Sequence, residues 1–315
     1  MNLIKKYKKS LKLIAQILLV IIIAWLMYGR LEAGFYQAVS RTNLLNWRIF
    51  VAVLAFSVAV MVSGYLWGRL INQLDSKFRT LEASESIKVH VVSWLLKYIP
   101  GQVGTLLSKM AWGSKNELSK KTVASSLIYE NIFLATSSLI LAIPAIGLSA
   151  LASFGQEAGL LIPLLMALLV VPLLVPRVLI SVVNFGLKLI KKKPIDNRHV
   201  LKSKYILSNQ FLYLLPRIIN GIGFVVIVGL FYQPSLFESI QLVGAYALAG
   251  IIGILAIFVP SGLGVREAVI IITVGPIIGY DSAAAAAIIA RFCATLADVL
   301  LGFVYIIIRA EHGKK

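Results

Sequence analysis

Long apolar runs separated by short polar stretches make up most of this 315-residue chain. A helix needs about 20 apolar residues to cross a bilayer. Six runs meet this requirement: Leu11–Met27, Trp47–Ile71, Thr122–Leu148, Leu160–Leu187, Tyr205–Tyr232 and Ser282–Ile308. The pattern therefore predicts an all-α polytopic membrane protein with about six full transmembrane helices and a single integral membrane domain over residues 1–315.

Two further apolar segments, Ser84–Trp112 and Ser239–Gly279, are each interrupted by a proline- and glycine-bearing motif. The first contains KYIPGQVG (97–104) and the second FVPSGLGVRE (258–267). Proline and glycine interrupt helices, and non-helical backbone at membrane depth is tolerated only where protein or a wet cavity covers it. We predict that each segment is a re-entrant broken hairpin that enters and leaves on one side. Two short full crossings per segment are the alternative.

The basic residues predict the orientation of these spans. Lys and Arg are concentrated in the N-terminal tail, in the interval 69–121, in the stretch 188–204 and in the C-terminal tail, whereas 152–159 and 231–239 contain none. Because cytoplasmic loops are enriched in basic residues, we expect both termini to be cytoplasmic, in a plasma (inner) membrane. Residues 152–159 are then expected to form an outer loop.

Composition changes this picture little. The chain is 59% hydrophobic and 14% charged, with a net charge of +18. Once the spans are assigned, no soluble basic face remains for nucleic acid, so the positive charge indicates cytoplasmic loops and anionic headgroups. His90 and His199 are predicted to be surface residues, and no histidine pair has metal-ligand spacing. We expect no metal and no cofactor.

A constant spacing relates the two interrupted segments. Pro100 and Pro260 are 160 residues apart, as are Gly104 and Gly264. The same offset maps the second predicted span onto the fifth and the third onto the last. The two copies would face opposite sides of the membrane, so we predict inverted repeats over 47–148 and 205–308, which is a pattern typical of transporters.

Seven ionisable residues fall at predicted membrane depth, where each costs about 3 kcal/mol or more when unpaired. They are Lys97, Glu130, Arg217, Arg266, Glu267, Arg291 and Asp298. In one interpretation the arginines pair with the carboxylates and fix the packing. In the other, the arginines and Lys97 line a cavity for an anionic headgroup, because guanidinium suits phosphate. Glu130 and Asp298 are expected to orient arginines, and Glu267 could instead be a favourable charge at a helix N-terminus.

The segments LLKYIPGQVGTLLSKMAW, SLIYENIF and VPSGLGVREAVIIIT closely resemble the lysylphosphatidylglycerol synthase transmembrane-region family of flippase-like membrane proteins. The resemblance covers about Leu11 to Ile308. It implies that the family's signature positions are Pro100, Gly101, Gly104, Pro260, Gly262, Gly264, Arg266 and Glu267. Several of these positions are expected to act as hinges. In family members with a soluble aminoacyltransferase domain, this region is thought to move aminoacylated lipid between leaflets. That soluble domain is not evident in this chain, so lipid aminoacylation is not implied.

The resemblance and the buried charges together predict a lipid flippase or lipid-binding transporter for an anionic phospholipid or lipid-linked headgroup. The alternative is an integral-membrane transferase that uses a polyprenyl-phosphate sugar donor, with Glu130, Glu267 or Asp298 as general base. The expected partners are anionic membrane lipids. A homo-oligomer and a partner membrane enzyme are both left open.

Overall fold

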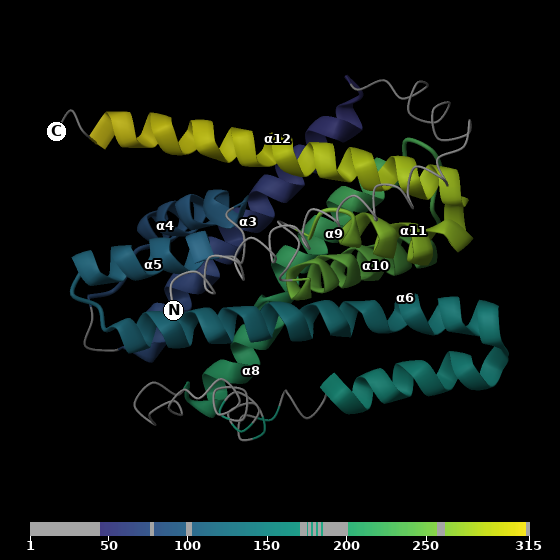
Figure 1. Ribbon diagram of the computed structural model, residues 1–315, viewed down its shortest axis with the longest axis horizontal. Coiled ribbons are helices and arrows are strands. Elements are labelled where there is room, and N and C mark those ends of the chain that lie inside the picture. Colours follow the sequence, from purple (N-terminus) through teal and green to yellow (C-terminus); the bar gives the residue numbers. More distant parts are fainter. Residues whose placement is uncertain are drawn as a thin grey trace, which may run out of the picture.

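The computed structural model describes residues 45–75, 79–98, 103–170, 201–256 and 262–312, together with four single positions between 175 and 184. All regular structure in these ranges is helical (Figure 1). The helices are α3 (Trp47–Leu74), α4 (Ala83–Leu95), the 3-10 turn η1 (Leu96–Tyr98), α5 (Val103–Lys115), α6 (Lys120–Val170), α8 (Ser203–Leu212), α9 (Leu214–Val228), α10 (Leu236–Leu255), α11 (Val265–Ile278) and α12 (Tyr280–His312). The all-α prediction is confirmed.

Five of the helices described are long and apolar enough to cross a membrane. They are Trp47–Leu74, Lys120–Pro144, Lys204–Val228, Leu236–Leu255 and Tyr280–Ile306. Four of them coincide with predicted spans. The first predicted span lies outside the described residues, and the fourth is described only in part.

The remaining one of these five helices, α10 (Leu236–Leu255), is part of the second predicted hairpin. Its 20 residues would extend about 30 Å, enough for a full crossing, whereas the 14 residues of α11 would extend only about 21 Å. The apolar pattern did not predict this difference in length between the two arms.

One segment expected to be a loop has a helical backbone. Residues 152–159 were predicted to form an outer loop, but they are helical and belong to α6, whose ribbon reverses direction at one side of Figure 1. The segment contains no proline, and most of its residues are compatible with a helix. The absence of basic residues there was not a sign of non-helical backbone.

Both interrupted segments fold as helix, break and helix. The arms α4 and α5 pack against each other around the first break, and α10 and α11 pack against each other around the second. Figure 1 shows the two pairs at opposite ends of the molecule, between α12 on one side and α6 on the other. Pro100, Gly101 and Pro260 lie outside the described residues.

The two most extensive helix pairings join the two halves of the chain. α6 makes its most extensive contacts with α10, and α3 with α9. A cluster of small and aliphatic side chains from α3, α9, α10, α11 and α12 forms the largest core. Phe303 and Ile306 of α12 point outward and are exposed, as expected of a lipid-facing surface.

Small residues allow close approach of α3 and α4. A Cβ atom built on Gly68 would lie 2.4 Å from Cβ of Ser86, and one on Gly64 would lie 2.9 Å from Cβ of His90. Glycines four residues apart let membrane helices approach until their backbones nearly touch. This packing brings His90 into the protein interior.

Candidate functional site

Two arginines from different helices converge beside the second break. Arg217 lies in the first turn of α9, and Arg266 lies in the first turn of α11. A Cβ atom built on Gly250 of α10 would lie 3.3 Å from Nη1 of Arg217 and 4.0 Å from Nη2 of Arg266. The glycine therefore leaves the space that both guanidinium groups approach. We call Arg217, Arg266 and the adjacent Tyr246 the arginine cluster.

The arginine cluster has an excess of positive charge. Nε and Nη2 of Arg217 are buried and have no hydrogen-bond partner among the described residues. Within the same ranges, no carboxylate lies at ion-pair distance from Arg217 or Arg266. The guanidinium carbon of Arg266 lies 5.7 Å from the centre of the Tyr246 ring. Two neighbouring cations, one of which has unsatisfied buried donors, form a strong anion-binding arrangement.

Glu267 and Arg291 border this cluster. Arg291 Nη1 lies 3.8 Å from Glu267 Oε1. The other carboxylate oxygen of Glu267 accepts a hydrogen bond of 2.7 Å from the backbone N–H of Gly264. Glu267 therefore caps the N-terminus of α11, which agrees with its alternative interpretation as a favourable charge at a helix N-terminus. It also holds the start of that helix close to Arg291.

Lys97 and Asp298 connect the first break to the last helix. Lys97 Nζ lies 2.7 Å from Asp298 Oδ2. The indole N–H of Trp94 donates to Asp298 Oδ1 at 2.8 Å, and Lys97 lies over the Trp94 ring, 4.1 Å from its centre. Asp298 thus has a lysine partner on another element of the chain, which the sequence did not predict. Among the ion pairs of the described residues, this one joins the two predicted repeats.

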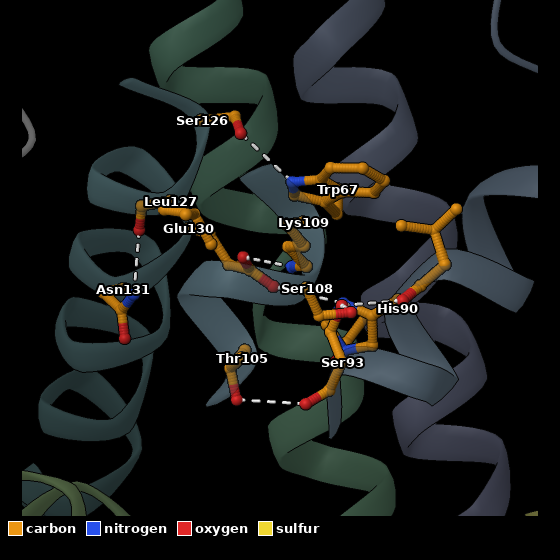
Figure 2. Close-up of polar contacts among 12 residues, drawn as sticks. Trp67, His90, Ser93, Thr105, Ser108, Lys109, Ser126, Leu127, Glu130 and Asn131 are labelled. Carbon is orange, nitrogen blue, oxygen red and sulfur yellow. Dashed lines mark hydrogen bonds and ion pairs between the residues drawn. The ribbon is translucent and has the colours of Figure 1, made fainter. Parts of the chain in front are cut away.

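Glu130 forms a third polar cluster, apart from the arginines. Its Oε2 accepts a hydrogen bond of 2.8 Å from Lys109, whose side chain is completely buried (Figure 2). His90 Nδ1 lies 3.4 Å from the other oxygen, although without hydrogen-bond geometry. The Lys109 ammonium also lies 4.6 Å from the centre of the Trp67 ring. We call Lys109, Glu130 and His90 the buried triad.

The buried triad corrects two predictions. Glu130 contacts a lysine rather than an arginine, and His90 is buried rather than at the surface. Lys109 was counted among the cytoplasmic charges because it lies in a basic interval of the sequence. The signal that could have identified it is the spacing in Lys109-Met-Ala-Trp112, which places it in an otherwise apolar stretch beside an aromatic residue.

The glycines of the second break are required by its geometry. Gly262 and Gly264 have φ values of +65° and +79°, which L-residues with side chains rarely adopt. A Cβ atom on Gly262 would also lie 2.8 Å from Cα and O of Gly253 on α10. Gly104, in contrast, lies within α5. The break therefore packs directly on the backbone of α10.

We expect Gly262→Ala to destabilise the protein more than Gly279→Ala. Gly279 also has a positive φ of +84°, but a Cβ atom there meets nothing within 4 Å. Its substitution should cost about 1–2 kcal/mol for the backbone alone, whereas overlap at Gly262 should add about 1–3 kcal/mol. Thermal unfolding of the purified variants in detergent measures the difference. Equal losses would show that the close approach to Gly253 does not contribute.

Comparison with known proteins adds the family. Residues 13–302 match the family described as Lysylphosphatidylglycerol synthase TM region. A search of the curated proteins finds no match.

Proposed function

The chain belongs to the lysylphosphatidylglycerol synthase TM region family, and we propose that it is a lipid flippase or lipid-binding transporter for an anionic headgroup. Membership of this family and the apolar helices of the chain indicate an integral membrane protein with a lipid-related function. The proposal adds the charge of the ligand, its binding site and its movement between leaflets. It also includes a plasma-membrane location with cytoplasmic termini.

The observation that carries this proposal is the arginine cluster. Arg217 and Arg266 approach the same glycine, and two buried nitrogen atoms of Arg217 lack partners in the part of the chain that the structure describes. Such an arrangement is costly in an empty protein, and a phosphate group would neutralise it with charge-assisted hydrogen bonds. The acyl chains of the same molecule could remain among the exposed apolar side chains of the helices.

The carboxylates support a transporter more than a transferase. A general base must lie within hydrogen-bond reach of the hydroxyl that it deprotonates. Glu130 is bonded to Lys109, Asp298 to Lys97, and Glu267 to the backbone of Gly264. All three are less than 10% exposed. Each candidate base is therefore engaged by a cation or a helix terminus in this structure.

The helix boundaries agree with the proposed inverted repeat. α4 ends at Leu95 and α10 at Leu255, while α6 begins at Lys120 and α12 at Tyr280, so both pairs of boundaries are 160 residues apart. The packing is reciprocal as well, because α4 contacts α12 and α10 contacts α6. In the proposed mechanism, movement of one repeat against the other alternates access to the arginine cluster, as in other transporters with inverted repeats.

A reconstitution experiment tests the function. The purified protein is placed in liposomes containing a trace of fluorescent phosphatidylglycerol or phosphatidylcholine, and the fraction accessible to a membrane-impermeant quencher is followed with time. We expect faster movement of phosphatidylglycerol than in empty vesicles and a smaller effect on phosphatidylcholine. If neither lipid, nor native anionic lipid extract assayed in the same way, moves faster than in empty vesicles, translocation is refuted.

A further inference from the structure

A cavity lined by a basic residue lies away from the arginine cluster, at the C-terminal end of α3. Its volume is about 320 Å³, within the range typical of small-ligand sites. The lining residues come from α3, from the beginning of α4, from Leu81 two residues before it, and from α8. They are Tyr65, Gly68, Arg69, Asn72, Gln73, Leu81, Ala83, Ser86 and Tyr205. Most of them are polar or aromatic, and none is acidic.

Arg69 is the lining residue whose charge is not neutralised. Its Nε atom is buried and has no hydrogen-bond partner in the part of the chain that the structure describes. No carboxylate of the described residues lies within ion-pair distance of its guanidinium group. A buried cationic donor without a partner is costly unless a ligand satisfies it.

Two neighbouring amide side chains are already engaged with protein atoms. The side chain of Asn72 both donates to the carbonyl oxygen of Leu81 and accepts from its N–H, at 3.1 and 2.8 Å. The Gln73 oxygen accepts from Asn209 at 2.6 Å. These bonds fix part of the cavity wall, and the guanidinium of Arg69 is the charged group among the lining residues.

The position of Arg69 along α3 places it near a lipid headgroup level. α3 has 28 residues, and Trp47 at its beginning is an exposed aromatic residue of the kind enriched at membrane interfaces. A hydrocarbon core of about 30 Å takes about 20 residues of helix, so the opposite interface falls close to Arg69. The Lys204 ammonium, over the ring of Tyr205 at 5.0 Å, adds positive charge beside the cavity.

We propose that this cavity binds a phosphate-bearing anion at the membrane interface, with Arg69 as its principal contact. The phosphate belongs either to an anionic lipid headgroup of the adjacent leaflet or to a soluble phosphate compound. The site is separate from the arginine cluster, which is built from α9, α10 and α11, and it does not depend on the proposed transport activity.

The experiment compares ligand retention in three variants of the full chain. Arg69→Gln removes the charge, and Ala83→Phe fills the cavity without changing the charge. Arg79→Gln is the matched control, because Arg79 is basic and exposed, is paired with Glu85 at 2.6 Å, and does not line the cavity. Native mass spectrometry after delipidation and titration with phosphatidylglycerol reports lipid binding. Thermal shift with sn-glycerol 1-phosphate and with inorganic phosphate reports soluble anions.

We expect Arg69→Gln and Ala83→Phe to weaken binding of one ligand class by about tenfold or more, since a charge-assisted hydrogen bond is lost or blocked. Arg79→Gln should bind like the wild type. A loss confined to phosphatidylglycerol identifies a lipid site, and a loss confined to the soluble phosphates identifies a solute site. If Ala83→Phe and a folded Arg69→Gln bind every probe as the wild type does, the proposal is wrong. Should Arg69→Gln fail to fold, unchanged binding by Ala83→Phe overturns it alone.

Discussion

Arg217→Met is expected to lower the rate of anionic lipid movement at least tenfold and, at the same time, to make the lipid-free protein more stable. The substitution removes a guanidinium group whose Nε and Nη2 atoms are buried without partners among the described residues. It also removes repulsion with Arg266, whose guanidinium approaches the same glycine. Relief of unsatisfied buried donors should stabilise the fold by about 1–3 kcal/mol. The same loss of donors should weaken binding of the anion in the transport cycle.

The opposite signs of these two effects separate a binding residue from a structural one. Arg48→Met is the matched control, because Arg48 lies in the first turn of α3 and donates to the carbonyl oxygen of Gly229 at the end of α9. Its loss should lower stability while each folded molecule still moves lipid at the wild-type rate. Transport in liposomes and thermal unfolding in detergent measure the two quantities. A less stable Arg217→Met with normal transport would show that Arg217 only supports the fold.

Breaking the buried triad should produce the largest loss of stability in the protein. Glu130→Gln leaves the completely buried Lys109 without its 2.8 Å partner, and Lys109→Met leaves Glu130 without its cation. Removal of one partner from a buried ion pair costs about 3–5 kcal/mol. We expect each single variant to unfold at markedly lower denaturant. Titration of mixed micelles with dodecyl sulfate, followed by circular dichroism, measures the change.

The double variant Lys109→Met/Glu130→Gln distinguishes a specific pair from general damage to the core. With both charges removed, stability should recover to within about 2 kcal/mol of the wild type, because neither charge remains buried alone. The exposed pair of Arg79 and Glu85 provides the control, and Glu85→Gln should change stability by less than about 1 kcal/mol. Additive losses in the double variant would contradict coupling between Lys109 and Glu130.

Much of the fold could be predicted from the pattern of apolar runs because membrane helices must satisfy their backbone internally. α3 and α12 begin and end close to the predicted positions, and so does the pair formed by α8 and α9. The two breaks were predicted because proline and glycine in an apolar segment have few structural explanations. The helical backbone over 152–159 was missed, since a lack of Lys and Arg indicates sidedness but says nothing about whether the chain is helical.

The site could be predicted only as a set of charged residues. Their partners depend on contacts between segments far apart, as in the bond between Lys97 and Asp298, which are separated by 201 positions. Lys109 was missed because a lysine of a buried ion pair and a lysine of a cytoplasmic loop look alike in a basic interval. The convergence of Arg217 and Arg266 depends on Gly250, whose importance arises from the absence of a side chain.

The dominance of α3–α9 and α6–α10 packing has a consequence for biosynthesis. When α6 has left the ribosome, α4, α5 and α6 can already form the buried triad, since all three residues belong to the first half. The surfaces of α3 and α6 that later cover α9 and α10 must then remain in contact with lipid or insertion factors until the second half is translated. The order of synthesis therefore allows a stage in which the buried triad is complete, while the arginine cluster and the most extensive helix pairings still await the second half.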